Sequence, residues 1–182
     1  MLDVFMLTFG EPEADDNFAI LQEKAPHAKR IDGIEGLLNA HKACAKESRT
    51  SYFYVCDADA VIQENFAFKF TPSDRREAYP GVKETECVFT YRSHNPINDL
   101  IYGYGGVKLF PKKNLLAVDE FKVDMTTSIG AKFNAAKANI GFFLTVLATP
   151  LTAPVMPLVT DLTRLPSPYN CLGCCPRDIA II

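Results

Sequence analysis

The sequence has no excess of positive charge. Its 182 residues include 19 Lys and Arg against 22 Asp and Glu, which gives a net charge of −3. A broad electrostatic field for nucleic acid needs a basic surplus, so the composition disfavours that class of protein and leaves room only for a local basic groove. Hydrophobic residues make up 48% and charged residues 23%, as in a soluble globular domain with its own core.

Internal repeats, heptads and a secretory signal are also missing. Asp3 and Glu11 interrupt the short apolar stretch at the N-terminus, so we expect no signal peptide there. The thiols of Cys44, Cys56 and Cys87 stand in apolar surroundings and are expected to be reduced core residues. A second group of cysteines lies in the tail, at Cys171, Cys174 and Cys175. No histidine lies nearby to complete a zinc site with these three thiols. An intracellular setting is expected.

Charge almost disappears in the last quarter of the chain. The stretch from Ala138 to Thr160 has no charged residue, and its length would suit a membrane span. Pro150, Pro154 and Pro157 oppose a regular helix across it. We therefore expect no stable membrane insertion. The chain divides into a body, residues 1–134, and an apolar tail with proline and cysteine, residues 135–182, which is packed on the body, poorly ordered or not a native ending.

The body begins with alternating strand and helix patterns. Apolar runs predict strands at Leu2–Phe9, Ala28–Ile34 and Ser51–Cys56. One helix is expected between the first two strands, ending before Pro26, and Gly36–Ser48 is expected to form the next. The order β-α-β-α-β predicts an α/β fold with a parallel sheet and helices on its faces. Later candidates are strands at Phe66–Phe70, Cys87–Arg92 and Gly106–Phe110, and helical turns at Pro111–Val118.

Two carboxylates follow the third predicted strand at once. Asp57 and Asp59 stand where ligands of open parallel sheets bind, outside the carboxyl end of a strand. Strand alternation predicts that both side chains point the same way. Convergent carboxylates repel each other unless a cation lies between them or one is protonated. Mg²⁺ or Mn²⁺ is the expected cation, since both prefer oxygen ligands. The alternative is a solvated turn, in which aspartates are common.

The residues around this pair resemble a known family. The stretch Gly33–Ile62, GIEGLLNAHKACAKESRTSYFYVCDADAVI, is similar to family-2-like glycosyltransferases of the A-type fold. With NPINDLIYGYGGVKLFP (residues 95–111) added, the chain resembles glycosyltransferase-like domains of large tailed phages over roughly residues 2–134. The resemblance implies a Rossmann-like, mostly parallel sheet, an irregular tail, a nucleotide-sugar donor, and Mn²⁺ or Mg²⁺ held by a D-x-D motif. The acceptor stays open as a glycan or a modified nucleobase. The implied location is the cytoplasm, that of the host if the gene belongs to a phage.

The resemblance assigns donor-binding roles on the first half of the body. Thr8 and Glu11, after the first strand, would lie near the nucleobase and ribose. Asn39 and Lys42 would face the donor from the second helix.

The same resemblance assigns roles around the D-x-D motif. Asp57 and Asp59 would bind the ribose and the metal, with Asp59 as the direct metal ligand. Gly105 and Gly106 would allow the backbone to approach the sugar or the acceptor.

An inverting transferase also needs a carboxylate that takes the proton of the acceptor hydroxyl. A retaining transferase would not need this base, and the sequence leaves both mechanisms open. Asp99 and Asp124 are the candidates for this catalytic base. The alternatives are a turn or helix-cap role for Asp99 and a cap of the following turn for Asp124. His94 is either an acceptor or metal contact or simply solvated.

Two other functions compete with the transferase. The segment VCDADAV, residues 55–61, also resembles the haloacid-dehalogenase phosphohydrolases, whose first aspartate attacks phosphorus. That motif usually opens its domain, whereas two β-α units precede it here. A degenerate, non-catalytic binding module is the other alternative, because no histidine follows His94 to complete a metal shell.

Overall fold

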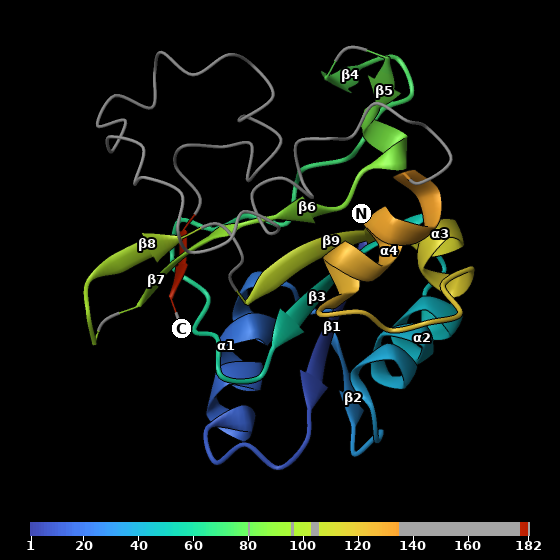
Figure 1. Cartoon of the computed structure of the whole chain (residues 1–182). Helices are drawn as coiled ribbons and strands as arrows, with labels where there is room; N and C mark the ends of the chain where they lie inside the picture. Colours follow the sequence, from blue (N-terminus) through green and yellow to red (C-terminus); the bar gives the residue numbers. More distant parts are fainter. Residues whose placement is uncertain (80, 96, 103–105, 135–178, 182) are drawn as a thin grey trace, which may run out of the picture.

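The first half of the body folds as the alternation of strands and helices predicts. In the computed structural model, β1 (Asp3–Thr8) lies between β2 (Lys29–Asp32) and β3 (Tyr52–Asp57), and both pairs are parallel. The crossovers are α1 (Ala14–Lys24) and α2 (Leu37–Glu47). The carboxyl ends of the three strands therefore meet at one edge of the sheet, which is where the fold positions Asp57 (Figure 1).

The structure describes residues 1–79, 81–95, 97–102, 106–134 and 179–181. Across these residues the main sheet gains two strands beyond β3. β9 (Val107–Pro111) is antiparallel to β3, and β6 (Phe89–Thr90) is antiparallel to β9. The order is β2-β1-β3-β9-β6, a mostly parallel sheet in which β9 runs against its neighbours. The predicted strands at Cys87–Arg92 and Gly106–Phe110 are thus confirmed with shifted bounds.

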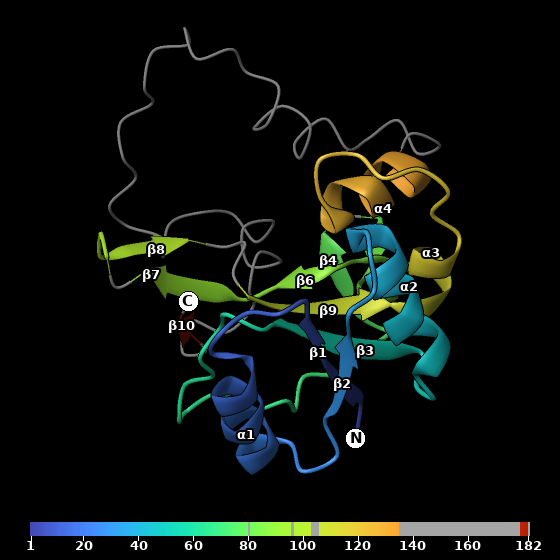
Figure 2. The same ribbon diagram turned by 90° about the horizontal axis from the view of Figure 1, so that it is seen from below.

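Helices cover the two faces of this sheet in separate layers. Alternation along β3 sends Tyr52, Tyr54 and Cys56 to the face that packs against α1, and Phe53 and Val55 to the opposite face. The second face is covered by α2, α3 (Lys112–Leu116) and α4 (Met125–Asn134). Figure 2 shows α1 on one side of the sheet and α2, α3 and α4 on the other.

The predicted strand at Phe66–Phe70 is wrong. These described residues form turns, with hydrogen bonds from the Phe66 amide to the Gln63 carbonyl and from the Lys69 amide to the Ala67 carbonyl. Phe66 and Phe68 are both buried with ring centroids 4.9 Å apart, and Phe68 packs edge-on against Tyr54 at 5.0 Å. Turns that pack aromatic side chains on the α1 face can have the same every-second-residue spacing as a strand. The spacing of these phenylalanines is therefore ambiguous unless the side chains that they pack against are known.

Smaller elements lie beside the main sheet. β4 (Glu77–Tyr79) and β5 (Val82–Lys83) form one hairpin, followed by the short helix η1 (Glu84–Glu86). β7 (Arg92–Asn95) and β8 (Leu100–Tyr102) form another, and β10 (Ile179–Ile181) pairs in parallel with β7. The tail, expected to be irregular, therefore contributes a strand in its described part.

The remaining predictions for the tail lie mostly outside the described residues. These include the apolar stretch Ala138–Thr160 and the cysteines at 171, 174 and 175. Over the part of the chain that the structure describes, we find no helix long and apolar enough to cross a membrane. In the body, Cys44 and Cys56 are buried free thiols, so the predicted core role is confirmed for these two, whereas Cys87 is half-buried.

Candidate functional site

The two aspartates of the motif lie in a tight turn at the end of β3. The strand ends at Asp57, and the Ala60 amide donates to the Asp57 carbonyl at 3.1 Å. Asp59 is therefore in the turn and not on the strand. We expected the two side chains to converge because of strand alternation, and this alternation does not extend to Asp59. The buried Asn17 of α1 donates from Nδ2 to the Ala58 carbonyl at 2.8 Å and fixes the turn against the helix.

Gly106 fixes the same turn from the opposite side. Its carbonyl accepts from the Asp57 amide at 2.7 Å, and its amide donates to the buried Ser93 Oγ at 3.2 Å. A Cβ at Gly106 would lie 2.3 Å from the Ala60 Cβ, which explains glycine here by packing against the D-x-D turn. An approach of Gly106 to a sugar or acceptor stays a prediction, and Gly105 lies outside the described residues.

A lysine that the sequence analysis missed contacts the first aspartate. The Lys108 ammonium lies 3.0 Å from Asp57 Oδ2, and the two side chains are 17% and 38% exposed. Lys108 stands opposite Val55 in the antiparallel β3–β9 register, so its side chain shares a face of the sheet with Val55 and with Asp57, two residues further on. Only the direction and register of β9 reveal this neighbour, and neither was in the sequence pattern.

Negative charge gathers around the second aspartate. Partial loss of water around the Asp59 carboxylate raises its pKa, the charge of Asp57 raises it further, and Glu11 adds to the effect. Lys108 acts in the opposite direction with a smaller effect. The carboxylates thus repel one another as the sequence argument expected, and a cation at Asp59 would relieve that repulsion.

Thr8, the last residue of β1, and Glu11, in the loop after it, lie at the same edge of the sheet. The buried Thr8 hydroxyl donates to Asp32 Oδ1 and accepts from Arg30 Nε at 3.0 Å, so it is used within the protein. Glu11 Oε2 accepts from the Phe9 amide at 2.7 Å. Asp32, the last residue of β2, joins this group. Its position near the carboxyl end of the predicted strand Ala28–Ile34 was the signal that could have identified it.

The predicted donor contacts on α2, Asn39 and Lys42, interact with other parts of the chain. Asn39 Nδ2 donates to the Glu35 carbonyl at 3.1 Å, next to the start of its own helix. The pKa of Asp119, in the loop before α4, is lowered first by its ion pair with Lys132 and to a smaller degree by the charge of Lys42. The structure therefore brings Lys42 near Asp119, and its contact with a donor stays a prediction.

Asp99 stands in the turn of the β7–β8 hairpin. Its φ of 58° is in the left-handed region, and its side chain is 93% exposed. Oδ1 of Asp99 lies 2.5 Å from Nε2 of His94, a half-buried residue of β7. Figure 1 shows the hairpin extending away from the five-stranded sheet. The turn role weighed for Asp99 is confirmed by this geometry, and its catalytic role remains untested.

Asp124 caps α4. Its Oδ1 accepts from the Thr127 amide at 2.8 Å and its Oδ2 from the Thr127 hydroxyl at 2.7 Å. Both carboxylate oxygens are therefore engaged in the cap, which is the alternative role that the sequence offered for this residue.

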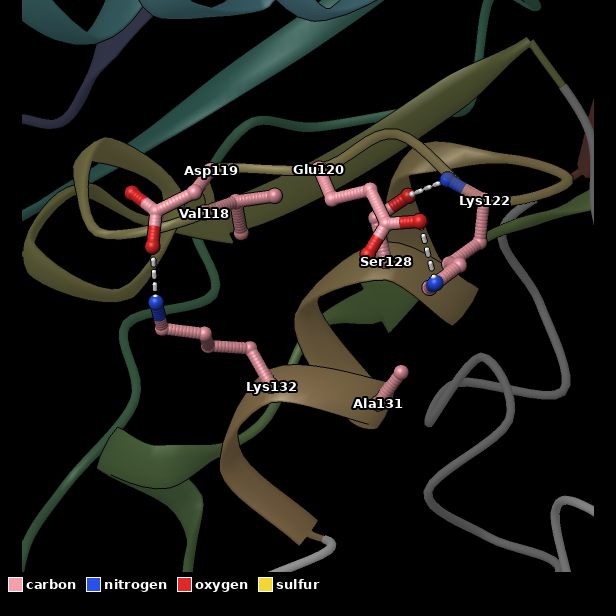
Figure 3. A pocket seen from close by; sticks show the side chains of 7 residues that line it. All are labelled: Val118, Asp119, Glu120, Lys122, Ser128, Ala131 and Lys132. Atoms are coloured by element: carbon pink, nitrogen blue, oxygen red, sulfur yellow. Dashed lines mark hydrogen bonds and ion pairs between the residues drawn. The ribbon is translucent and has the colours of Figure 1, made fainter.

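A cavity of about 380 Å³ lies elsewhere, between α4 and the loop that precedes it. Its walls carry the Lys132–Asp119 ion pair and a second pair, Lys122–Glu120, with 2.6 Å between charged atoms (Figure 3). None of the residues predicted from the sequence lines it. We therefore place the candidate site at the D-x-D turn, on the chemistry of its side chains.

Among the described residues, no group of three or more His, Cys, Asp or Glu side chains is arranged to hold a metal ion. At the D-x-D turn the protein therefore supplies at most two metal ligands. Two carboxylates suffice for Mg²⁺, which usually keeps waters and takes substrate phosphates as further ligands. The donor set therefore fits an ion completed by a diphosphate. No protein-family model and no curated protein matches this chain.

Proposed function

We propose that this domain binds a nucleotide sugar at the D-x-D turn and transfers the sugar to an acceptor hydroxyl. The observation that carries the proposal is the carboxylate turn at the carboxyl edge of β3, where burial, Asp57 and Glu11 all raise the pKa of Asp59. That edge is the general ligand position of open α/β sheets. A bound Mn²⁺ or Mg²⁺ would stabilise the charge of the departing nucleoside diphosphate.

The residues of the chain then have separate roles. Asp59 is the metal ligand, since it is exposed and Asp57 is already paired with Lys108. In the transfer, the acceptor oxygen bonds to the anomeric carbon, the bond from that carbon to the diphosphate oxygen breaks, and the acceptor proton passes to a base. Asp99 is the better candidate for that base, because both carboxylate oxygens of Asp124 are engaged in its helix cap, whereas Asp99 contacts His94 through Oδ1 alone.

The experiment is a calorimetric titration with nucleoside diphosphates and nucleotide sugars, with and without Mn²⁺. We expect Mn²⁺-dependent binding by the wild type and a loss of at least about tenfold in affinity in Asp59→Ala, because the metal loses its ligand. The matched control is Asp74→Ala, which removes an exposed aspartate from a different turn. Thermal unfolding of each variant checks that the fold is intact.

The outcomes separate the competing functions. Absence of binding by folded wild-type protein would contradict the proposal and leave the aspartates as a solvated turn. Hydrolysis of a simple phosphate ester without nucleotide would instead favour the phosphohydrolase. Tight binding without donor hydrolysis or transfer would identify a binding module.

A further inference from the structure

Lys108 is held against the candidate site by the main sheet itself. It lies in β9, whose antiparallel pairing runs from Cys56 opposite Val107 to Tyr52 opposite Pro111. The strand pairing fixes the backbone of Lys108 beside that of β3, and its side chain is only 17% exposed. The 3.0 Å ion pair is therefore a built feature of the site and differs from the exposed ion pairs of the surface.

The neighbour of Lys108 from α2 does not place a second positive charge beside Asp57. His41 is 2% exposed, its Nδ1 donates to the Leu37 carbonyl at 2.8 Å, and its ring packs edge-on against Phe110. Burial lowers the pKa of His41 to about 4, and the positive charge of Lys108 lowers it as well. The imidazole is neutral at pH 7, so His41 does not compete with Lys108 for Asp57, and Lys108 forms the ion pair with this carboxylate.

We propose that Lys108 is a positioning residue that reserves Asp57 for hydrogen bonding to the donor and leaves Asp59 as the carboxylate that meets the metal. This inference rests on the proposed function. Because Asp57 is paired with Lys108, the turn offers one unpaired carboxylate, too little to hold a divalent ion firmly without a diphosphate. Metal and nucleotide should then bind cooperatively, since each supplies what the other lacks.

The test measures Mn²⁺ binding in the absence of nucleotide, by the electron paramagnetic resonance signal of free Mn²⁺. In Lys108→Met the stem is kept and the charge is lost, so Asp57 becomes available as a second metal ligand. We expect Mn²⁺ alone to bind about fivefold more tightly, the scale of a partly exposed charge pair. Titration with a nucleoside diphosphate should show its enhancement of Mn²⁺ affinity reduced by a similar factor, because Mn²⁺ alone already binds more tightly to the variant. The enhancement of nucleotide affinity by Mn²⁺ should fall by the same factor.

Three further variants identify the cause. Lys108→Arg keeps the charge and should behave like the wild type. Lys29→Met removes the lysine of another ion pair, Lys29–Glu47 at 2.6 Å, and should leave Mn²⁺ binding unchanged. Adding Asp57→Asn to Lys108→Met should abolish the gain, because the second carboxylate is then missing. Lys108→Gln repeats the charge loss if Lys108→Met fails to fold.

The proposal is overturned if a folded Lys108→Met or Lys108→Gln protein binds Mn²⁺ no more tightly than the wild type. It is also overturned if the gain survives Asp57→Asn. A gain in Mn²⁺ affinity in a protein that binds no nucleoside diphosphate would uphold the effect of Lys108 on Asp57 and refute the proposed function. The two failures are therefore distinguishable.

Discussion

Replacing Gly106 with alanine tests whether β9 and the D-x-D turn are packed as closely as the structure shows. The new Cβ would lie 2.3 Å from the Ala60 Cβ, and the next atoms it meets are the Ala60 Cα at 3.6 Å and the Asp57 Cβ at 3.7 Å. The last two are ordinary contacts. One methyl group, that of Ala60, therefore accounts for the whole conflict.

The magnitude follows from overpacking of a buried position. Ala60 is fully buried, and its Cβ belongs to a backbone turn, so it cannot rotate out of the way. Forcing an extra methyl into such a site costs about 1–3 kcal/mol. Without the conflict, the same change would stabilise the protein by about 0.4–1 kcal/mol, because alanine restricts the unfolded chain. The sign of the measured change therefore distinguishes the two situations.

The compensating variant is Ala60→Gly. Alone it removes a buried methyl and should cost about 1 kcal/mol. Combined with Gly106→Ala it removes the conflicting atom, so the double variant should be more stable than the sum of the single changes predicts, by about 1–3 kcal/mol. Urea unfolding with linear extrapolation measures all four proteins, and the midpoints are compared at constant m-value.

Additive single changes, within about 0.5 kcal/mol, would refute the close approach of Gly106 to Ala60. A stabilising Gly106→Ala would do the same. Mn²⁺ binding measured on the same proteins should follow the stability pattern, because the Gly106 carbonyl holds the Asp57 amide at 2.7 Å.

Two further predictions concern stability against pH. Asp3 loses water on burial, which would raise its pKa, but hydrogen bonds from the amides of Arg49 and Thr50 and from the Ser48 hydroxyl lower the pKa below 3.8. Asp3→Asn should therefore cost about 1–3 kcal/mol of stability at neutral pH. Urea unfolding should show this deficit shrinking below pH 3.8, as the wild-type carboxylate becomes protonated. For His41 the folded pKa is about 4 against an ordinary 6.5, so its contribution to stability is complete above pH 6.5 and is lost as pH falls towards 4. His41→Leu should remove up to about 3 kcal/mol of this pH dependence of stability. Equal slopes of unfolding free energy against pH in the variant and the wild type would contradict this prediction.

The parallel part of the fold could be predicted from the sequence because each of its elements is locally encoded. The apolar run before Asp57 is long enough to form a strand, and helical spacing separates it from the earlier strands. Right-handed crossover connections then leave little freedom in how such units assemble. The position of Asp57 at the carboxyl edge follows directly, which is why the motif could be located before any coordinates.

The segment around Phe66 could not be predicted in the same way. Alternating aromatic residues are compatible with a strand and also with a series of turns packed on a sheet. Which of the two forms depends on packing against Tyr54 and Tyr91, which are distant in sequence. The Phe66 ring lies 5.0 Å from that of Tyr91, at an interplanar angle of 79°. Tertiary packing therefore overrides the local pattern here.

The chemistry of the candidate site likewise depends on contacts between residues that are distant in sequence, which a local pattern does not predict. Asp57 and Asp59 come from one local motif. The groups that adjust them come from about fifty residues later, Lys108 from β9 and Gly106 from the position just before it. A parallel β9 with another register would put a different side chain beside Asp57. Because a shift of one residue in register turns a strand residue to the opposite face, the charge balance of the site depends on the β3–β9 pairing. The variants of Lys108 and Gly106 therefore probe one feature, the alignment of β9 with the carboxylate turn.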